Sequence, residues 1–303
     1  MRQPRSIPPR AWFELFLIAV IWGASFLSIR VALDEMGVFT IVALRVLGGG
    51  AILWAYVLAR GLNVPRDGRI WFAFLVMGIL NNVLPFSLIA WGQLTIPSGT
   101  TAILNAATAL FGVLLAAVAL PDEGLTSRKL TGVVLGLAGV AVVMGQDALS
   151  ALDLTSVSQL ALLAAALSYA LAAVWARKRL SGLPPQVAAA GMLTTSTLIM
   201  LPIALAVDGQ PDAQHSVAVW AAIGYLAIFS TAIAYLLFYR VLAMAGAGNV
   251  SLCTLMATPF AILLGALVLD EALPSHAYAG FALIAAGLLV IDGRLLPRRK
   301  EAA

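Results

Sequence analysis

Ten apolar segments of membrane-spanning length follow one another along this chain of 303 residues. A helix of roughly 20 residues crosses the hydrocarbon core of a bilayer. Only 11% of the residues are charged, whereas a soluble domain has roughly 25%. This pattern excludes a water-soluble enzyme and a disordered chain, and it predicts an all-α polytopic membrane protein. The predicted spans are residues 11–32, 37–59, 70–92, 98–120, 127–145, 158–176, 185–207, 217–239, 249–269 and 275–291.

The basic residues are distributed on one side of the predicted topology. With ten spans both termini share a side, and 16 of the 18 Lys and Arg residues fall there. The other two, Arg30 and Arg45, lie inside spans, and the opposite loops contain none. Because cytoplasmic loops carry an excess of Lys and Arg, both termini are predicted to be cytoplasmic. The predicted location is the bacterial inner (plasma) membrane.

The sequence also repeats itself. The segment from Pro121 resembles the segment from Leu269, with five matches at one offset. These matches predict two halves of five spans, residues 1–151 and 152–303. Because five is odd, the halves cross the membrane in opposite senses, as in transporters that work by alternating access. A duplicated scaffold without a pathway is the alternative. The matched pairs are Asp122 and Asp270, Glu123 and Glu271, Leu125 and Leu273, Gly132 and Gly280, and Gly139 and Gly287.

Three sequence motifs resemble the drug/metabolite transporter (DMT) superfamily with two EamA-type repeats. The first span reads WGASFLSIRVAL from Trp22, the fourth and fifth spans join through LPDEGLTSRKLTG, and VLDEALPSHAYAG follows Pro259 in the second half. The first half has Ala109 near the position of that proline. Within the superfamily the chain is most similar to YddG-like amino-acid exporters. The resemblance implies ten helices, a central cavity lined by helices 1, 3, 4, 6, 8 and 9, and export of small organic metabolites such as (aromatic) amino acids.

Three charged residues stand within the spans, apart from Arg128 and Lys129 at the start of the fifth span and His276 at the edge of the last one. Each requires an explanation, because a charge near the bilayer centre costs several kcal/mol. Glu14 is near the cytoplasmic end, so it can reach the surface. Arg30 can pair with Asp34 or Glu35, or it can act in gating or contact a substrate carboxylate. Arg45 lies deeper, and either structural pairing or a role in the pathway explains it.

Neutral polar and aromatic side chains in the spans are the candidate cavity residues. Thr101, Asn105 and Thr108 are spaced by four and three, so they share one helix face. The alternatives are helix packing for the polar residues and interface positions for Trp91 and Tyr239. The predicted set is Trp22, Asn81, Asn82, Trp91, Thr101, Asn105, Thr108, Tyr169, Trp175, Ser230, Thr231, Tyr235 and Tyr239.

Small residues and one proline are predicted to be structural. A small residue every three or four positions allows helices to approach closely. We therefore assign Gly132, Gly139, Gly280 and Gly287 to packing, with Pro259 at the position of the family's proline.

The sequence has no pattern of catalytic or metal-binding residues. Cys253 is the only cysteine, and His215 and His276 lie in or beside predicted external loops. A non-enzyme with no metal and no cofactor is therefore expected, and transport is predicted to be facilitative or by exchange. Alternatives are a DMT-type exporter of drugs or nucleotide sugars, a passive pore and a scaffold. The expected partners are the lipid bilayer and a small-molecule substrate, with no nucleic acid; an oligomer is left open.

Overall fold

The computed structural model describes residues 7–150, 156–210, 214–269 and 275–292, and this part of the chain contains helices and no strand. The predicted boundary between the halves and the second Asp-Glu pair lie outside these ranges. The elements are α1 (Pro9–Leu33), α2 (Val38–Ala59), α3 (Gly68–Gly78), η1 (Ile79–Val83), α4 (Leu84–Gly92), α5 (Ser98–Ala119), α6 (Ser127–Ser150), α7 (Val157–Arg179), α8 (Pro185–Val207), α9 (Val217–Ala227), η2 (Ile228–Ile233), α10 (Ala234–Ala245), α11 (Ala247–Val250), α12 (Leu252–Leu269) and α13 (Ser275–Asp292).

The helices coincide with the ten predicted spans and confirm the all-helical fold. Within the described residues, eight continuous helical segments are long and apolar enough to cross a membrane. The other two predicted spans correspond to α6 and α13, which pack against each other. Helices are expected because a backbone in lipid has to satisfy its own N–H and C=O groups. Pro9 and Pro185 stand in the first turns of α1 and α8, where a missing N–H costs nothing.

The outer surface of the bundle is rich in apolar side chains. Val118 is 89% exposed, Leu58 is 72% exposed and Leu198 is 69% exposed. A water-soluble protein rarely exposes large contiguous apolar areas. The surrounding medium that suits this surface is the hydrocarbon of a lipid bilayer.

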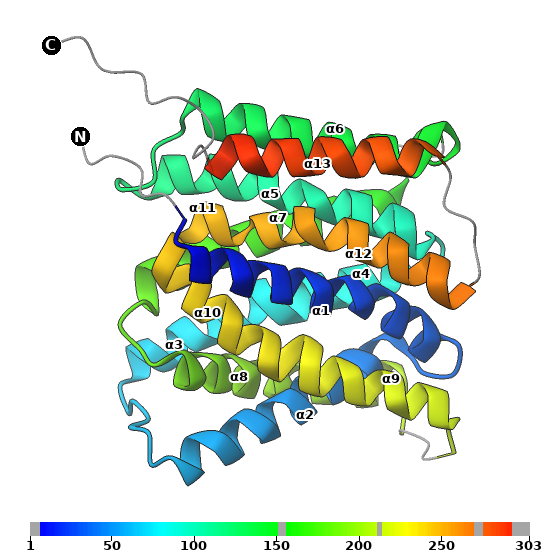
Figure 1. Ribbon diagram of the computed structural model, residues 1–303. Helices are drawn as coiled ribbons and strands as arrows, with labels where there is room; N and C mark the ends of the chain where they lie inside the picture. The colour runs from blue at the N-terminus through cyan, green and yellow to red at the C-terminus, as the bar shows by residue number, and fades with distance from the viewer. Residues whose placement is uncertain (1–6, 151–155, 211–213, 270–274, 293–303) are drawn as a thin grey trace, which may run out of the picture.

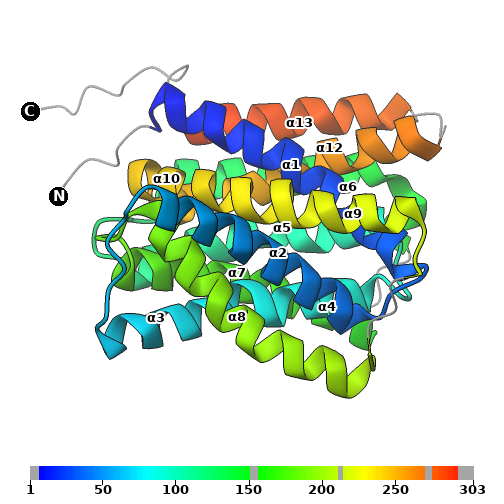
Figure 2. The same cartoon turned by 90° about the horizontal axis from the view of Figure 1, so that it is seen from below.

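The two halves interlock. The most extensive helix contacts pair α6 with α13, α2 with α8, α1 with α12, and α5 with α7. Each pair joins one helix from either half, and the first helix of each half packs on the fourth helix of the other. Exchanging the halves therefore reproduces the pairing, as an approximate twofold axis requires. Figures 1 and 2 show the helices side by side along a common direction, with the start of α1 and the end of α13 at the same end of the bundle.

Glycines allow α6 and α13 to approach at the edge of the bundle (Figure 1, top). A Cβ at Gly139 would lie 2.8 Å from the carbonyl oxygen of Gly280, and one at Gly287 would lie 2.5 Å from that of Gly132. A side chain at either position would therefore collide with the backbone of the other helix. The predicted structural glycines thus lie at this contact, and Pro259 lies inside α12.

Two π-helical turns interrupt corresponding helices of the halves. Ile79 and Ile228 begin η1 and η2, 149 positions apart. Pro85 follows η1 and has no N–H to offer the carbonyl of Asn81. The hydroxyl of Tyr235, from the other half, lies 3.4 Å from that carbonyl and donates to the neighbouring Asn82 Oδ1. Such turns are frequent at functional sites, and both lie beside the cavity described below.

Carboxylates connect the halves at both ends of the bundle. The loop residue Glu35 accepts the Ser216 N–H at 2.7 Å, and hydrogen bonding from Ser216 lowers the pKa of Glu35. At the other end, Glu14 accepts hydrogen bonds from Arg10 and Arg240. Glu14 is only 3% exposed. The sequence suggested that Glu14 reaches the surface. Its carboxylate is instead covered, and two exposed arginines pair with it.

Candidate functional site: a buried polar cavity

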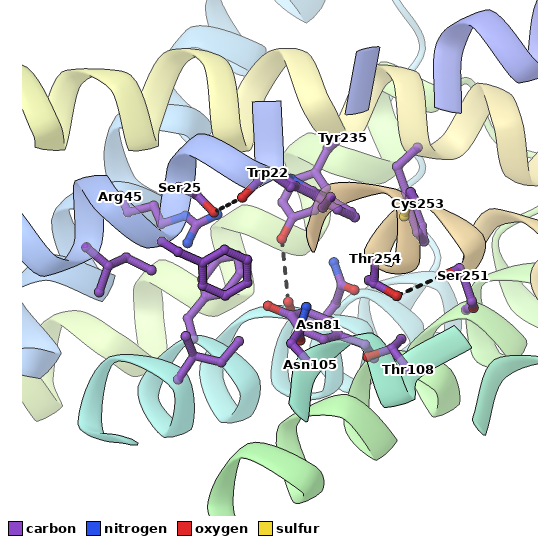
Figure 3. Close-up of a pocket in the computed structure, with 18 residues that line it drawn as sticks. Trp22, Ser25, Arg45, Asn81, Asn105, Thr108, Tyr235, Ser251, Cys253 and Thr254 are labelled. Carbon is purple, nitrogen blue, oxygen red and sulfur yellow. Dashed lines mark hydrogen bonds between the residues drawn. The ribbon is translucent and has the colours of Figure 1, made fainter. Parts of the chain in front are cut away.

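A cavity with a volume of about 50 Å³ lies between the two halves. One water needs roughly 10–15 Å³ of such space, so this conformation has room for only a few waters. Figure 3 shows the lining side chains, which come from both halves. They are Trp22, Ser25, Phe26, Ile29, Arg45, Asn81, Phe86, Ile89, Asn105, Thr108, Tyr169, Ala173, Tyr235, Phe238, Ser251, Cys253, Thr254 and Ala257.

Arg45 is the one ionised side chain among these lining residues, and it is 4% exposed. Its Nε donates to the hydroxyl of Thr231 at 2.9 Å and its Nη2 to the hydroxyl of Ser230 at 3.0 Å. Its guanidinium carbon lies 3.6 Å from the centre of the Phe86 ring, a cation–π contact. Within the described part of the chain, no carboxylate lies within 4 Å of this guanidinium. Among the described residues, the groups that stabilise this buried cation are therefore neutral.

Two glycines bring Arg45 to its partners. A Cβ at Gly49 would lie 2.6 Å from the Thr231 side chain, and a Cβ at Gly48 would lie 2.9 Å from the Ala227 side chain. Helix α2 therefore packs closely on α9 and η2. This close approach allows the guanidinium, four positions from Gly49, to reach the hydroxyls on η2.

Two polar atoms in the cavity wall have no hydrogen-bond partner among the described residues. Asn105 Oδ1 and Thr108 Oγ1 are buried and form no hydrogen bond with the described residues. Both belong to α5, one turn apart, and both line the cavity. A buried polar group without a partner costs about 1–3 kcal/mol. A ligand or ordered water in the cavity would remove that cost.

Aromatic rings supply the apolar part of the wall. Trp22 lies against Phe238, with ring centroids 6.2 Å apart, and Phe86 lies against Tyr169 at 6.4 Å. The indole N–H of Trp22 donates to the Ser230 carbonyl at 3.1 Å, so the π-helical turn also orients this ring. The site thus combines one cation, unpartnered polar atoms and ring faces, a set suited to a small amphipathic carboxylate.

Of the thirteen predicted cavity residues, six line the cavity: Trp22, Asn81, Asn105, Thr108, Tyr169 and Tyr235. Three others lie directly behind the wall. Ser230 and Thr231 hold Arg45. Asn82 donates to Ser196 at 2.8 Å and accepts a hydrogen bond from Tyr235.

The remaining four predicted cavity residues lie elsewhere, which corrects their placement. Trp91 is 41% exposed on the outer surface. Thr101 donates to the carbonyl of Pro97 in its own chain segment. Trp175 lines a separate groove with Arg69 and Arg179. Tyr239 is buried with its hydroxyl against a methionine sulfur. A polar or aromatic side chain in a span has packing and interface positions open to it besides the cavity.

Arg30 does not reach the cavity. Its side chain is exposed and pairs with Asp34, with 3.5 Å between Nη2 and Oδ1. This pairing is one of the two interpretations that the sequence offered. The cavity residues that the sequence analysis missed are mostly apolar or small. Ser251 and Thr254 could have been found, because two hydroxyl residues three positions apart on the ninth span share a helix face. The same spacing argument identified Asn105 and Thr108 on α5. The missed residues are Ser25, Phe26, Ile29, Phe86, Ile89, Ala173, Phe238, Ser251, Cys253, Thr254 and Ala257.

Two interlocked halves around a buried cavity define a polytopic membrane carrier. Comparison with known proteins gives the family. Residues 11–145 and 157–292 each match the EamA-like transporter family, and the chain belongs to this family. A crystal structure that is 22% identical superposes with a TM-score of 0.77 over 93% of this chain and 98% of that one, a likeness that shows the fold.

Three relatives are named as exporters, efflux pumps or transporters. The chain is 30% identical over 297 residues to the "Probable terminal-alkyne amino-acid exporter" of Streptantibioticus cattleyicolor, with 97% of each chain covered. It is 25% identical to the "Probable amino-acid metabolite efflux pump" of Escherichia coli, over 90% of this chain and 92% of the relative. The "Uncharacterized inner membrane transporter YedA" of Escherichia coli is 26% identical over 73% and 70%. The chain is therefore a multi-pass membrane transporter.

Proposed function

We propose that this transporter exports small amino acids or closely related carboxylates, aromatic ones included, by alternating access. The observation that carries the proposal is Arg45, a buried cation in the cavity wall without a carboxylate partner among the described residues. A substrate carboxylate would supply that partner by accepting a charge-assisted hydrogen bond from the guanidinium. The names of two relatives support the same substrate class.

The rest of the cavity fits the remainder of such a substrate. Asn105 Oδ1 and Thr108 Oγ1 have free acceptor capacity for an ammonium group. The rings of Trp22 and Phe238 offer faces to a cation or an apolar side chain. Because about 50 Å³ holds only a few waters, we expect the two halves to move apart at one end when a substrate binds.

A ligand panel tests the substrate class. Purified protein is heated with aromatic, aliphatic and alkyne-bearing amino acids, with sugars and with nucleotides, and the melting temperature is recorded. We expect amino acids to raise it and to slow alkylation of Cys253, which lines the cavity. Stabilisation by sugars or nucleotides alone would contradict the proposal, and a flux that does not saturate would indicate a passive pore.

We expect transport without ion coupling. No Asp, Glu or His is among the described residues that line the cavity, and such groups usually carry protons in membrane transporters. In proteoliposomes a substrate gradient alone should drive uptake, and an imposed pH or Na⁺ gradient should not raise internal substrate above equilibrium. Concentrative uptake driven by either gradient would contradict this prediction, and Glu14 would be the first residue to test.

The orientation stays a prediction, with both termini on the cytoplasmic side of an inner membrane. Cysteines introduced as Ser150→Cys and Arg66→Cys in a Cys253→Ser background report it. A membrane-impermeant thiol reagent added to whole cells should label the first position and leave the second unlabelled until the cells are opened. The reverse pattern would invert the predicted topology.

A further inference from the structure

Glu123 connects the two halves at a point outside the cavity lining. It lies in the junction between α5 and α6 and is 8% exposed. Its Oε1 accepts the N–H of Ala247 at 2.7 Å, and its Oε2 accepts the N–H of Gly248 at 2.8 Å. Both N–H groups begin α11 in the second half. The carboxylate therefore spans the two halves with two charge-assisted hydrogen bonds, which are among the stronger kind.

Two glycines make room for this carboxylate. Gly246 has φ of +88°, a conformation that side-chain-bearing residues rarely adopt, and a Cβ there would lie 2.5 Å from Glu123 Oε1. A Cβ at Gly248 would lie 3.1 Å from Oε2. The chain between α10 and α11 is thus shaped around the Glu123 side chain.

A chain of hydrogen bonds leads from this carboxylate to the cavity. Ala247, whose N–H binds Glu123, accepts the hydroxyl of Ser251 at 3.1 Å. The Ser251 carbonyl accepts the hydroxyl of Thr254 at 2.8 Å, the contact drawn in Figure 3. Ser251, Thr254 and Cys253 all line the cavity. One wall of the cavity is therefore tied to a carboxylate from the opposite half.

We propose that Glu123 is a positioning residue for the transport cavity: it holds the α11 to α12 segment of the second half in register with the first half. The proposal rests on the proposed function, because it takes this cavity as the transport site. Glu123 itself stays outside the cavity lining and acts through Ala247 and Ser251. Loss of its charge would loosen the cavity wall formed by Ser251, Cys253 and Thr254 and weaken substrate binding.

Cys253 makes the test direct, because it is the only cysteine of the chain and it lines the cavity at 1% exposure. Its alkylation by N-ethylmaleimide is followed in purified full-length protein. Glu123→Gln keeps the shape but leaves one N–H facing an amide NH2, so we expect alkylation to accelerate about tenfold and the KM for transport to rise. Gly246→Ala should reproduce this effect from the other side of the contact.

Asp122→Asn is the matched control. Asp122 is the neighbouring acid and pairs with Arg177 at the surface, with 3.1 Å between Oδ2 and Nη2. We expect Cys253 in this variant to be alkylated at a rate within about twofold of the wild type, since a surface ion pair contributes little to stability. Unchanged rates in both Glu123→Gln and Gly246→Ala would overturn the proposal, even if both variants melt earlier, because a purely structural cap would lower stability alone.

The substrate proposal and the Glu123 proposal can fail separately. Alkylation of Cys253 needs no substrate, so a faster rate in Glu123→Gln supports positioning even if no amino acid is transported. If Glu123→Gln does not yield folded protein, Glu123→Asp tests the same contact. Its shorter side chain reaches one N–H at most, and a rate equal to that of the wild type would count against the proposal.

Discussion

Replacing Arg45 with glutamine is expected to weaken binding of a carboxylate substrate by about 10–100-fold. A hydrogen bond to a charged group contributes about 1.5–3 kcal/mol, and 1.4 kcal/mol corresponds to a factor of ten. Glutamine retains hydrogen-bonding capacity toward Thr231 but removes the charge. Arg45→Lys should have an intermediate affinity for the substrate. An ammonium group has fewer donors than the planar guanidinium, which contacts Thr231 and Ser230 and has a further N–H for a ligand.

Substrate esters separate charge recognition from general damage to the site. Wild-type protein should prefer an amino acid over its methyl ester, and Arg45→Gln should lose that preference. The melting temperature of the empty variant should not fall, because burying an unpaired cation is costly. Arg30→Gln is the control, since Arg30 is exposed and pairs with Asp34. Equal loss in both arginine variants, or a retained preference in Arg45→Gln, would exclude the proposed carboxylate contact.

The second large effect concerns the contact between α6 and α13. A Cβ at Gly139 would lie 2.7 Å from the backbone nitrogen of Ile284 and 2.8 Å from the carbonyl oxygen of Gly280. Gly139→Val should therefore push the helices apart and lower the free energy of unfolding by about 3 kcal/mol, near the upper end for overpacked interiors. Thermal unfolding of the protein in detergent measures the loss.

Gly224→Val provides a matched control within a helix. Gly224 lies inside α9, and a Cβ there would meet nothing within 4 Å. The same substitution should therefore change the melting temperature little, because no neighbour has to move. Similar melting temperatures for the two variants would show that the α6 to α13 contact is looser than the structure indicates.

The fold was predictable because the bilayer restricts what a long apolar segment can form. Ten runs of sufficient length, with their basic residues on one side, led to the helices that the structure contains. The repeated Asp-Glu junction correctly indicated a duplication. It did not indicate that Glu123 binds the N–H groups of Ala247 and Gly248, because which helix ends meet depends on packing between residues far apart in sequence.

The cavity was predictable only where polar residues stand out in an apolar span. Asn105 and Thr108 were visible for that reason, and both line the site. Phe86 and Phe238 were not, because a phenylalanine in a span looks the same whether it faces lipid, a neighbouring helix or a cavity. Trp91 shows the converse limit, since a ring near the end of a span also fits the lipid interface, and this ring is exposed on the outer surface of the protein.

The interlocking of the halves has a consequence for biosynthesis. A ribosome completes the first five helices before their partners exist, because synthesis proceeds from the N-terminus. The Gly132 and Gly139 positions of α6 then have no helix to cover them until α13, the last helix of the described residues, is made. The nascent first half is therefore incomplete in the membrane, and a chain that stops before α13 leaves these positions of α6 uncovered.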